Sequence, residues 1–419
     1  MLKLYLIVLV GLIFLPLGAQ WEYLGLSEVS INKISLHEDN LYAATDNGLY
    51  VKDVTRPDTI WTHVGLEDEG LMGLLIIDEN SFIVSKSDFE TDNFIVRTDN
   101  AGEEWYPFIE GIERDRNMFV RDFDIYQDED ETIIIAAGSL IITRHSTQTN
   151  RWELVHGRWG NIGGSYFIKF AHSSPEIAWA GGETAFFAPS LAKSVDYGMN
   201  WELLDVWGGG DNRCLSIATD PNNRDIAYIG MGGIIVKTVN GGQDWYTVLA
   251  TGIDDPYYSF TGVFVSDHDS DVVYASGYRS GDYRDIKLFV SLDAGEEWTS
   301  ESFEHGRYRV MSMDYRATSS ADELYLATTE GGILRYSKYL LDTPIVETEV
   351  VTIDEMDYIS LHWQVIEDAA SYKIYSTNDP NVLDWGEPIA INSETQFVQP
   401  LTDAAKKFFR VTASAEEAP

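Results

Sequence analysis

The chain has 419 residues, of which 68 are Asp or Glu and 29 are Lys or Arg, so its formal net charge is -39. A field this negative repels phosphates, which excludes nucleic acid as a partner. One cysteine excludes a disulfide scaffold. A content of 44% hydrophobic and 13% aromatic residues can bury a large core, which excludes a chain that is disordered throughout.

Residues 1–19 have the composition of a secretory signal peptide. Lys3 precedes the apolar run Leu4–Leu17, and the small residues Gly18 and Ala19 follow it. The run is short for a membrane span of about 20 residues, so cleavage after Ala19 is favoured over an uncleaved anchor. We expect no membrane span after cleavage, and a protein that is secreted or located in the periplasm or at the cell surface.

A tryptophan-led segment recurs along residues 20–340. The intervals between these segments run from 40 residues (Trp21 to Trp61) to 53 residues (Trp245 to Trp298). That period fits the four-stranded blade of a β-propeller. We expect each of these tryptophans to be a core residue that fills the gap between blades. The seven are Trp21, Trp61, Trp105, Trp152, Trp201, Trp245 and Trp298.

The two ends of the repeat array are complementary. Each interval holds further short β-branched and aromatic runs separated by Gly, Asn and Asp, which are typical of strands and hairpins. The last interval has three such runs and no tryptophan strand, whereas Trp21–Leu26 has no strands before it. We therefore predict that Trp21–Leu26 pairs with Gly332–Ser337 and closes a ring of seven blades, which removes an exposed sheet edge.

Four repeats carry the motif Ser/Thr-x-Asp/Asn-x-Gly-x-x-Trp between their third and fourth strands. A hydroxyl and a carboxylate or amide two residues later can hydrogen-bond the backbone of a tight turn, and Gly supplies a positive φ. We predict a structural role for all sixteen motif residues: Thr98, Asn100, Gly102, Trp105, Ser194, Asp196, Gly198, Trp201, Thr238, Asn240, Gly242, Trp245, Ser291, Asp293, Gly295 and Trp298.

These turns resemble the Asp-boxes of the bacterial-neuraminidase-repeat propellers. That group includes sialidases, the sortilin luminal propeller, xyloglucan-cleaving hydrolases and the seven-bladed photosystem II assembly factor. The resemblance covers about residues 20–340, and the turns before Trp61 and Trp152 lack the motif. It implies that the boxes lie on the perimeter, away from the ligand face, so Asp196 and Asp293 are expected to be structural and not catalytic.

Residues 341–419 form a second predicted domain, because the repeat ends at the linker Leu341–Pro344. An alternating strand with a tryptophan (Ile359–Trp363), a tyrosine-rich strand (Ala370–Tyr375) and a late strand (Phe408–Val411) together resemble a fibronectin type III domain. The resemblance implies a small β-sandwich that acts as a spacer or attachment module. The predicted fold is all-β: a seven-bladed propeller closed by an N-terminal strand, over residues 20–340, and a C-terminal sandwich.

Arginines and aromatic residues gather in the connections between blades, on the face opposite the motif turns. Arg can make bidentate hydrogen bonds to a carboxylate or sulfate, and an aromatic ring can stack on a sugar. The alternative is local charge balance, since Glu113, Asp211 and Asp254 share these loops. The candidate ligand-binding residues are Arg114, Arg121, Trp207, Arg213, Tyr258, Arg279 and Arg309.

These patterns indicate an exported, monomeric, non-enzymatic binding or scaffold protein whose partner is a glycan, an anionic ligand or another protein. The alternative is a sialidase-like glycoside hydrolase that acts on extracellular glycans. The Arg-Ile-Pro segment implied by a sialidase resemblance does not occur, and no carboxylate pair stands out among the 68 acidic residues. We predict no catalytic residue, no cofactor and, with no zinc spacing among the eight His, no metal site.

Overall fold

The computed structural model is built from β-strands, and the part of the chain that it describes contains no helix and hence none able to span a membrane. It describes residues 20–414 apart from residues 89–92, 113–118, 140, 157–163, 185–187, 207–212, 252–257, 280–284, 305–308, 319–320, 340–343, 345, 354–355, 367–368, 378–387 and 401–407. The predicted signal segment, residues 1–19, therefore lies outside the described residues.

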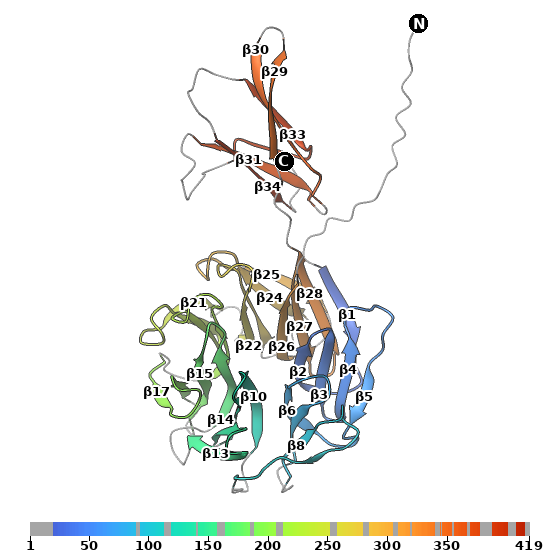
Figure 1. The fold of residues 1–419 in the computed structure, drawn as a ribbon, viewed down its shortest axis with the longest axis vertical. Coiled ribbons are helices and arrows are strands. Elements are labelled where there is room, and N and C mark those ends of the chain that lie inside the picture. The colour runs from blue at the N-terminus through green and yellow to red at the C-terminus, as the bar shows by residue number, and fades with distance from the viewer. Residues whose placement is uncertain are drawn as a thin grey trace. The chain divides into compact units, whose positions relative to one another are not determined.

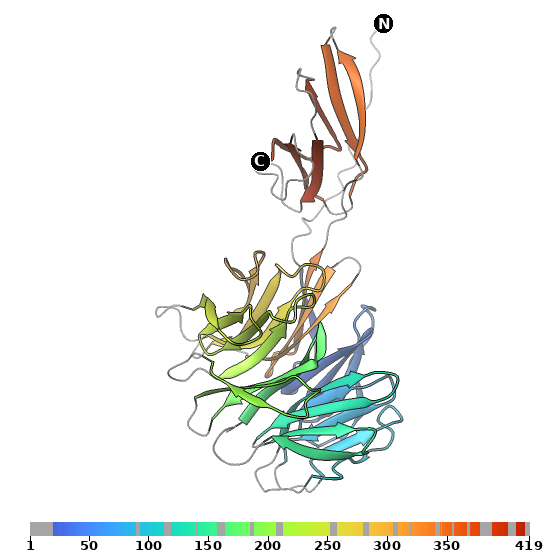
Figure 2. The same cartoon turned by 60° about the vertical axis from the view of Figure 1, so that its left-hand side comes forward.

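Seven four-stranded sheets form the blades of a propeller (Figures 1 and 2). The first four blades follow one another along the chain, each with its strands in sequence order. Blade 1 is β2 (Ile31–His37), β3 (Asn40–Thr45), β4 (Gly48–Asp53) and β5 (Thr62–Gly65); blade 2 is β6 (Leu71–Ile76), β7 (Phe82–Lys86), β8 (Ile95–Thr98) and β9 (Tyr106–Pro107); blade 3 is β10 (Val120–Gln127), β11 (Thr132–Gly138), β12 (Ile142–Ser146) and β13 (Arg151–His156); blade 4 is β14 (Gly164–Ala171), β15 (Ser174–Glu183), β16 (Pro189–Ser194) and β17 (Glu202–Leu204).

The last three blades complete the ring. Blade 7 takes its outermost strand from the beginning of the chain, in the order β1-β28-β27-β26. Blade 5 is β18 (Cys214–Thr219), β19 (Ala227–Met231), β20 (Ile234–Thr238) and β21 (Tyr246–Ala250); blade 6 is β22 (Tyr258–Val265), β23 (Val273–Arg279), β24 (Asp285–Ser291) and β25 (Thr299–Glu304); blade 7 is β26 (Val310–Ala317), β27 (Ala321–Thr328), β28 (Ile333–Tyr339) and β1 (Gln20–Gly25).

The pairing of β1 with β28 confirms the predicted closure of the ring. The innermost strands contact one another in the cyclic order β2, β6, β10, β14, β18, β22, β26 and back to β2. The closing strand is also held by side chains, because Trp21 packs edge-on against Tyr336 with ring centroids 5.1 Å apart and Glu22 forms an ion pair with Arg335.

Apolar side chains fill the spaces between neighbouring blades, and the repeat tryptophans pack at the rims of these clusters. Trp152 is buried and its Nε1 donates to the carbonyl oxygen of Phe108 at 2.8 Å. The other six repeat tryptophans are half-buried, which differs from the expected full burial. Five of these six stand one residue before the outermost strand of their blade, whereas Trp152 lies within β13.

The four motif turns share one set of hydrogen bonds. In the turn before Trp298, the hydroxyl of Ser291 donates to Oδ1 of Asp293 at 2.8 Å and accepts the backbone N–H of Gly295 at 2.8 Å. Oδ1 of Asp293 accepts the backbone N–H of Glu297 at 2.8 Å. The same three bonds recur in the turns that begin at Thr98, Ser194 and Thr238.

Each inner strand of blades 1 to 6 carries a β-bulge near its start. In blade 3 the register shifts between Val120 and Asp122, so that Arg121 has no partner on β11. Equivalent shifts occur on β2, β6, β14, β18 and β22. The bulge brings the two backbones close together: a Cβ on Gly138 of β11 would lie 1.8 Å from the carbonyl oxygen of Phe119. A bulge re-aims the side chain of the extra residue.

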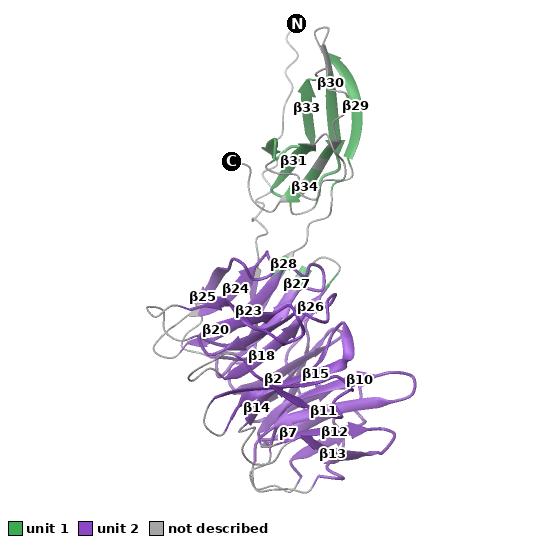
Figure 3. Cartoon of the chain, turned by 90° about the vertical axis from the view of Figure 1, so that its left-hand side faces the viewer, with its two compact units in different colours: residues 1–20, 318–322, 337–419 green, residues 21–317, 323–336 purple. Residues whose placement is uncertain are grey.

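The contacts divide the chain into two compact units, coloured separately in Figure 3; the larger covers residues 21–317 and 323–336. The other unit contains two three-stranded sheets, with the orders β29-β30-β33 and β32-β31-β34. A cluster that includes Leu361, Trp363, Tyr372 and Val411 fills its core, as expected for a small sandwich. Its strands are β29 (Val346–Ile353), β30 (Met356–Trp363), β31 (Ser371–Thr377), β32 (Ala390–Asn392), β33 (Gln396–Pro400) and β34 (Phe408–Ser414).

Candidate functional site

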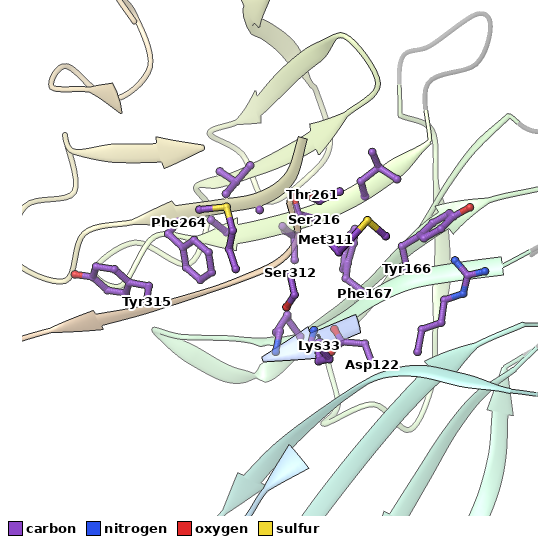
Figure 4. A pocket seen from close by; sticks show the side chains of 18 of the residues that line it. Lys33, Asp122, Tyr166, Phe167, Ser216, Thr261, Phe264, Met311, Ser312 and Tyr315 are labelled. Carbon is purple, nitrogen blue, oxygen red and sulfur yellow. Dashed lines mark ion pairs between the residues drawn. The ribbon is translucent and has the colours of Figure 1, made fainter. Parts of the chain in front are cut away.

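A cavity of about 530 Å³ lies at the centre of the propeller, and all seven inner strands contribute to its wall (Figure 4). Its size falls within the range of roughly 300–1,000 Å³ that is usual for small-molecule sites. None of the residues of the four motif turns lines it. The centre of the ring is therefore the candidate site.

The bulge residues form a ring around this cavity. Because the bulge frees them from the strand ladder, their side chains are re-aimed toward the centre, and all of them belong to the cavity wall. Met311 occupies the corresponding place on β26, one residue after Val310. In blade order from 1 to 7 the ring consists of Asn32, Met72, Arg121, Tyr166, Leu215, Thr261 and Met311.

The guanidinium of Arg121 is held by aromatic rings. Its central carbon lies 4.5 Å from the ring centroid of Tyr166 and 4.9 Å from that of Phe119. Its Nε is buried without a hydrogen-bond partner, and no carboxylate among the described residues forms an ion pair with it. The stacking fixes the orientation of the positive charge, and no described residue accepts a hydrogen bond from its N–H groups.

A second guanidinium reaches the same tyrosine. Nη1 of Arg213 donates to the hydroxyl oxygen of Tyr166 at 3.4 Å, and this bond is the main cause of the raised pKa of Arg213. Nε of Arg213 lies 3.2 Å from Oε2 of Glu183, whose Oε1 accepts the Tyr166 hydroxyl at 2.9 Å. Unlike Arg121, Arg213 is therefore already neutralised by a carboxylate of the protein.

An ion pair in the same cavity wall joins the inner strands of blades 1 and 3. Nζ of Lys33 on β2 lies 2.6 Å from Oδ1 of Asp122 on β10, and Oδ2 of Asp122 accepts the backbone N–H of Ile168 at 3.1 Å. Burial alone would raise the pKa of Asp122, but the charges of Lys33 and Lys169 and these hydrogen bonds outweigh it and lower the pKa. Asp122 is thus kept ionised and cannot serve as a proton donor.

The carboxyl group of Asp124, two residues after Asp122, has a pKa that is shifted in the opposite direction. The pKa of Asp124 is raised because burial outweighs the charge of Lys169 and the bond from the Phe170 backbone N–H to its Oδ2, at 2.7 Å. The pKa of Lys169 is raised by Asp124, Asp122 and Asp314, against the effect of burial. Asp122 and Asp124 therefore tie β10 to β14 through backbone N–H groups, in the way that structural carboxylates do.

The predicted ligand-binding residues are distributed unevenly. Arg121 and Arg213 line the cavity. Arg309 lies just before β26, with its guanidinium 5.2 Å from the ring centroid of Tyr278, another cavity residue. Arg279 ends β23 and is not part of the cavity wall. Arg114 and Trp207 lie outside the described residues.

Tyr258 is placed away from the cavity surface. It is the first residue of β22 and is buried between blades 5 and 6, where its hydroxyl lies 3.1 Å from the carbonyl oxygen of Lys287. Its proximity to a loop in the sequence gave no sign of this burial. Conversely, the sequence interpretation overlooked Tyr166, which could have been found because it lies near the start of its inner strand, as Arg121 does.

No metal centre is evident in the part of the chain that the structure describes. Among those residues, no group of three or more His, Cys, Asp or Glu side chains is placed to hold a metal ion. The acidic turn near β11 uses its carboxylate locally, since Oδ1 of Asp128 accepts the backbone N–H groups of Asp130 and Glu131 at 2.9 and 2.8 Å. The described part of the site offers cations, carboxylates, hydroxyls, aromatic rings and apolar side chains.

Fold and site together define a seven-bladed β-propeller with a central cavity. No family model and no curated protein matches the sequence. Solved structures with a similar fold exist, and they are also propellers. At their level of identity, the similarity shows the fold alone.

Three of these structures illustrate the similarity. The GH74 xyloglucanase from Xanthomonas campestris is 13% identical, with a TM-score of 0.56, and the match covers 82% of this chain and 60% of the xyloglucanase. YCF48 bound to D1 peptide is 12% identical, with a TM-score of 0.54, and the match covers 78% of this chain and 98% of that protein. For the extracellular domain of a putative one component system from B. thetaiotaomicron, the identity is 13%, the TM-score 0.52 and the coverage 90% of this chain and 49% of the domain. This chain thus spans less than two thirds of the first and third of these proteins.

Proposed function

We propose that the protein is an exported, monomeric binding protein without enzymatic activity, and that it holds the anionic group of a glycan, small molecule or protein partner at the Arg121 end of the central cavity. The observation that carries the proposal is the guanidinium of Arg121, stacked between Phe119 and Tyr166 without an ion pair among the described residues. The predicted signal peptide supports export, and the sandwich is assigned the role of a spacer or attachment module.

The guanidinium of Arg121 has neither a carboxylate nor a backbone carbonyl as a partner among the described residues. The chain has 68 acidic against 29 basic side chains, and other buried or half-buried cations without an ion pair are bound by backbone carbonyls, as Lys193 is by Gly241 and Lys237 by Ala294. A partly desolvated cation without a counterion raises the free energy of the unbound protein. An anionic ligand would remove that cost and form charge-assisted hydrogen bonds with preoriented donors, each worth about 1.5–3 kcal/mol.

The similar propellers support more than one class of partner. YCF48 is bound to a peptide, whereas the xyloglucanase is named for a glycan. Both classes can present carboxylates or hydroxyls to Arg121 and Tyr166. The anionic group is therefore the part of the ligand that the geometry of this site supports best.

The test is a binding screen with a matched pair of variants. The panel contains monocarboxylates, sulfated and uronate oligosaccharides, acidic peptides and neutral oligosaccharides. We expect anionic members to bind and R121Q to weaken them at least about tenfold, ~1.4 kcal/mol. The control is R224Q, which removes the same charge from an arginine that is 52% exposed, paired with Glu176 and absent from the cavity wall. Equal affinity of R121Q and R224Q for every anion would contradict the proposal.

One observation favours a second function, glycoside hydrolysis with a tyrosine nucleophile. The Tyr166 hydroxyl donates to a carboxylate oxygen of Glu183 at 2.9 Å, an arrangement that activates a nucleophile, and sialidases use a tyrosine in this way. Hydrolysis also needs an acid beside the leaving group, and Asp122, which lines the cavity, is held ionised by Lys33. This requirement is why binding is the first proposal.

The two functions separate in one assay. Fluorogenic glycosides of acidic sugars are incubated with the wild-type protein and with Y166F. A hydrolase releases the fluorophore and loses that activity in Y166F, whereas a binding protein releases none although the same glycosides compete for its site. Absence of release from the whole glycoside set by the wild-type protein would rule out hydrolysis of these acidic sugars.

A further inference from the structure

The wall of the central cavity differs between the two sides of the ring. The inner strands of blades 1, 3 and 4 contribute all the charged strand residues of the described wall, Lys33, Arg121, Asp122 and Lys169, together with Phe167 and Phe170. The inner strands of blades 5 to 7, whose residues are all described, contribute Leu215, Phe264, Met311 and Met313 and no charged residue, since Arg213 and Asp267 lie outside the strands, before β18 and after β22. Figure 4 shows Lys33 beside Asp122, with Phe264 and Tyr315 at another part of the cavity.

Small residues make room for the apolar side chains of this wall. The first paired residue after the bulge is Lys33 in blade 1 and Asp122 in blade 3, but it is Ser216 in blade 5 and Gly262 in blade 6. A Cβ on Gly262 would lie 2.3 Å from Sδ of Met313, so the lack of a side chain at this position makes room for Met313, which lines the cavity.

The apolar side chains on this wall are only partly covered by the protein. Met311 is 39% exposed although it stands on the innermost strand of the ring, and Leu215 and Phe264 are half-buried. All three line the cavity, so their uncovered surface faces it. Removing apolar surface of this kind from water is favourable, at about 25 cal/mol per Å².

We propose that the ligand is an amphipathic carboxylate, with its carboxylate at Arg121 and an apolar body against Leu215, Phe264 and Met311. The inference rests on the proposed function, since it assumes the anion site at Arg121 and adds the chemistry of the rest of the ligand. A site that is lined by apolar side chains and has a few oriented polar groups at its mouth is the usual form of a small-molecule pocket. Sugar acids, whose bodies carry hydroxyls, would leave the apolar wall without a partner.

The experiment is calorimetric titration of the full mature chain with a homologous series: acetate, butanoate, hexanoate, octanoate and decanoate. Glucuronate serves as a carboxylate with a polar body, and octan-1-ol as the apolar body without the charge. We expect each added methylene to tighten binding about fourfold, equivalent to ~0.8 kcal/mol per buried CH₂. Glucuronate is expected to bind no better than acetate, and octan-1-ol more weakly than octanoate.

Two variants locate the apolar body. M311Q replaces the thioether with an amide of similar length and should reduce the gain from acetate to octanoate at least about tenfold, with little effect on acetate itself. The control is M199Q at a methionine of comparable exposure, 47%, in a motif turn away from the cavity wall. M199Q should behave like the wild-type protein throughout the series.

The outcomes separate the two proposals. Affinity that does not rise with chain length, or glucuronate that binds more tightly than octanoate, would overturn the amphipathic ligand. If R121Q still weakened glucuronate in that case, the anion site would stand. If R121Q left every carboxylate unchanged, the proposed function and this inference would both fall.

Discussion

Inside the ring, two residues from different blades neutralise each other. Asp122 is 1% exposed and its only described cation within ion-pair distance is Lys33, whose side chain is 23% exposed. Replacing both partners of such a pair with apolar groups is often tolerated, whereas removing one leaves an uncompensated buried charge. Replacing only one residue of the pair is therefore expected to lower the stability more than replacing both.

We predict that D122N lowers the free energy of unfolding at pH 7 by about 3 kcal/mol, near the lower end of the range for such losses because Lys33 retains some solvent contact. The double variant K33M/D122N should recover a large part of this loss. Urea unfolding of the wild-type protein, D122N, K33M and K33M/D122N measures both values, as a double-mutant cycle. A D122N effect below about 1 kcal/mol would mean that the pair is not a structural element.

The lowered pKa of Asp122 gives this effect a pH dependence. A carboxyl group with a lower pKa in the folded state contributes stability above its ordinary pKa of about 3.9, and this contribution is lost as the pH falls. The difference between wild type and D122N should thus be greatest near neutral pH and shrink as the pH falls below about 4. A difference that grew on acidification would contradict the assigned direction.

At the scale of strands, the bulges decide which side chains surround the cavity. Arg121 and Tyr166 are 45 positions apart in sequence (166 − 121) and meet because β10 and β14 carry the bulge at equivalent places. Gly138 on β11 permits the bulge of β10, since its backbone lies against Phe119. The geometry of the site thus depends on a residue that takes no part in it.

We predict that G138A displaces the backbone at Phe119 and Arg121, because the new Cβ would lie 1.8 Å from the Phe119 carbonyl oxygen. Both stability and anion binding should fall, the latter at least about tenfold. The control is G164A, since a Cβ at Gly164 meets no atom within 4 Å. Thermal unfolding and titration of both variants test this, and wild-type binding by G138A would show that the bulge does not position Arg121.

The sequence predicted the positions of the strands better than the directions of the side chains. Trp201 and Trp245 marked two outer strands, because a repeat can be recognised in the sequence without knowing which residues contact one another. Tyr258 and Arg121 both looked like residues near a loop, yet Tyr258 is buried and Arg121 faces the cavity. The difference depends on the register of each strand ladder, which the order of residues does not determine. Glu183 was missed because its role depends on Tyr166 from the paired strand of the same blade and on Arg213, just before the inner strand of the next blade.

At the scale of the whole molecule, the two ends of the propeller sequence meet in one sheet. β1 covers the edge of β28, which would otherwise expose unpaired backbone groups. Trp21 adds contacts to Tyr336 and to Phe303, with ring centroids 5.1 and 5.5 Å apart. Ring closure is therefore expected to make the unfolding of the seven blades cooperative.

We predict that a chain that begins after Ser27, and so lacks β1, loses its single cooperative transition or aggregates through the uncovered edge of β28. Calorimetry and size-exclusion chromatography measure the two effects. The reference is the chain that begins at Gln20, which keeps β1 and should unfold as a soluble monomer. An unchanged melting profile after removal of β1 would mean that closure contributes little to stability.

The central claim, that a ligand binds inside the ring at Arg121, is tested most directly by hydrogen–deuterium exchange. The tightest-binding anion of the screen is added to the wild-type protein, and exchange is compared with that of the unbound protein. The account predicts slower exchange in peptides that contain the starts of β10, β14 and β18, where Arg121, Tyr166 and Leu215 line the cavity, and no change in the turns 194–201 and 291–298. Protection confined to those turns, with the inner strands unaffected, would contradict it.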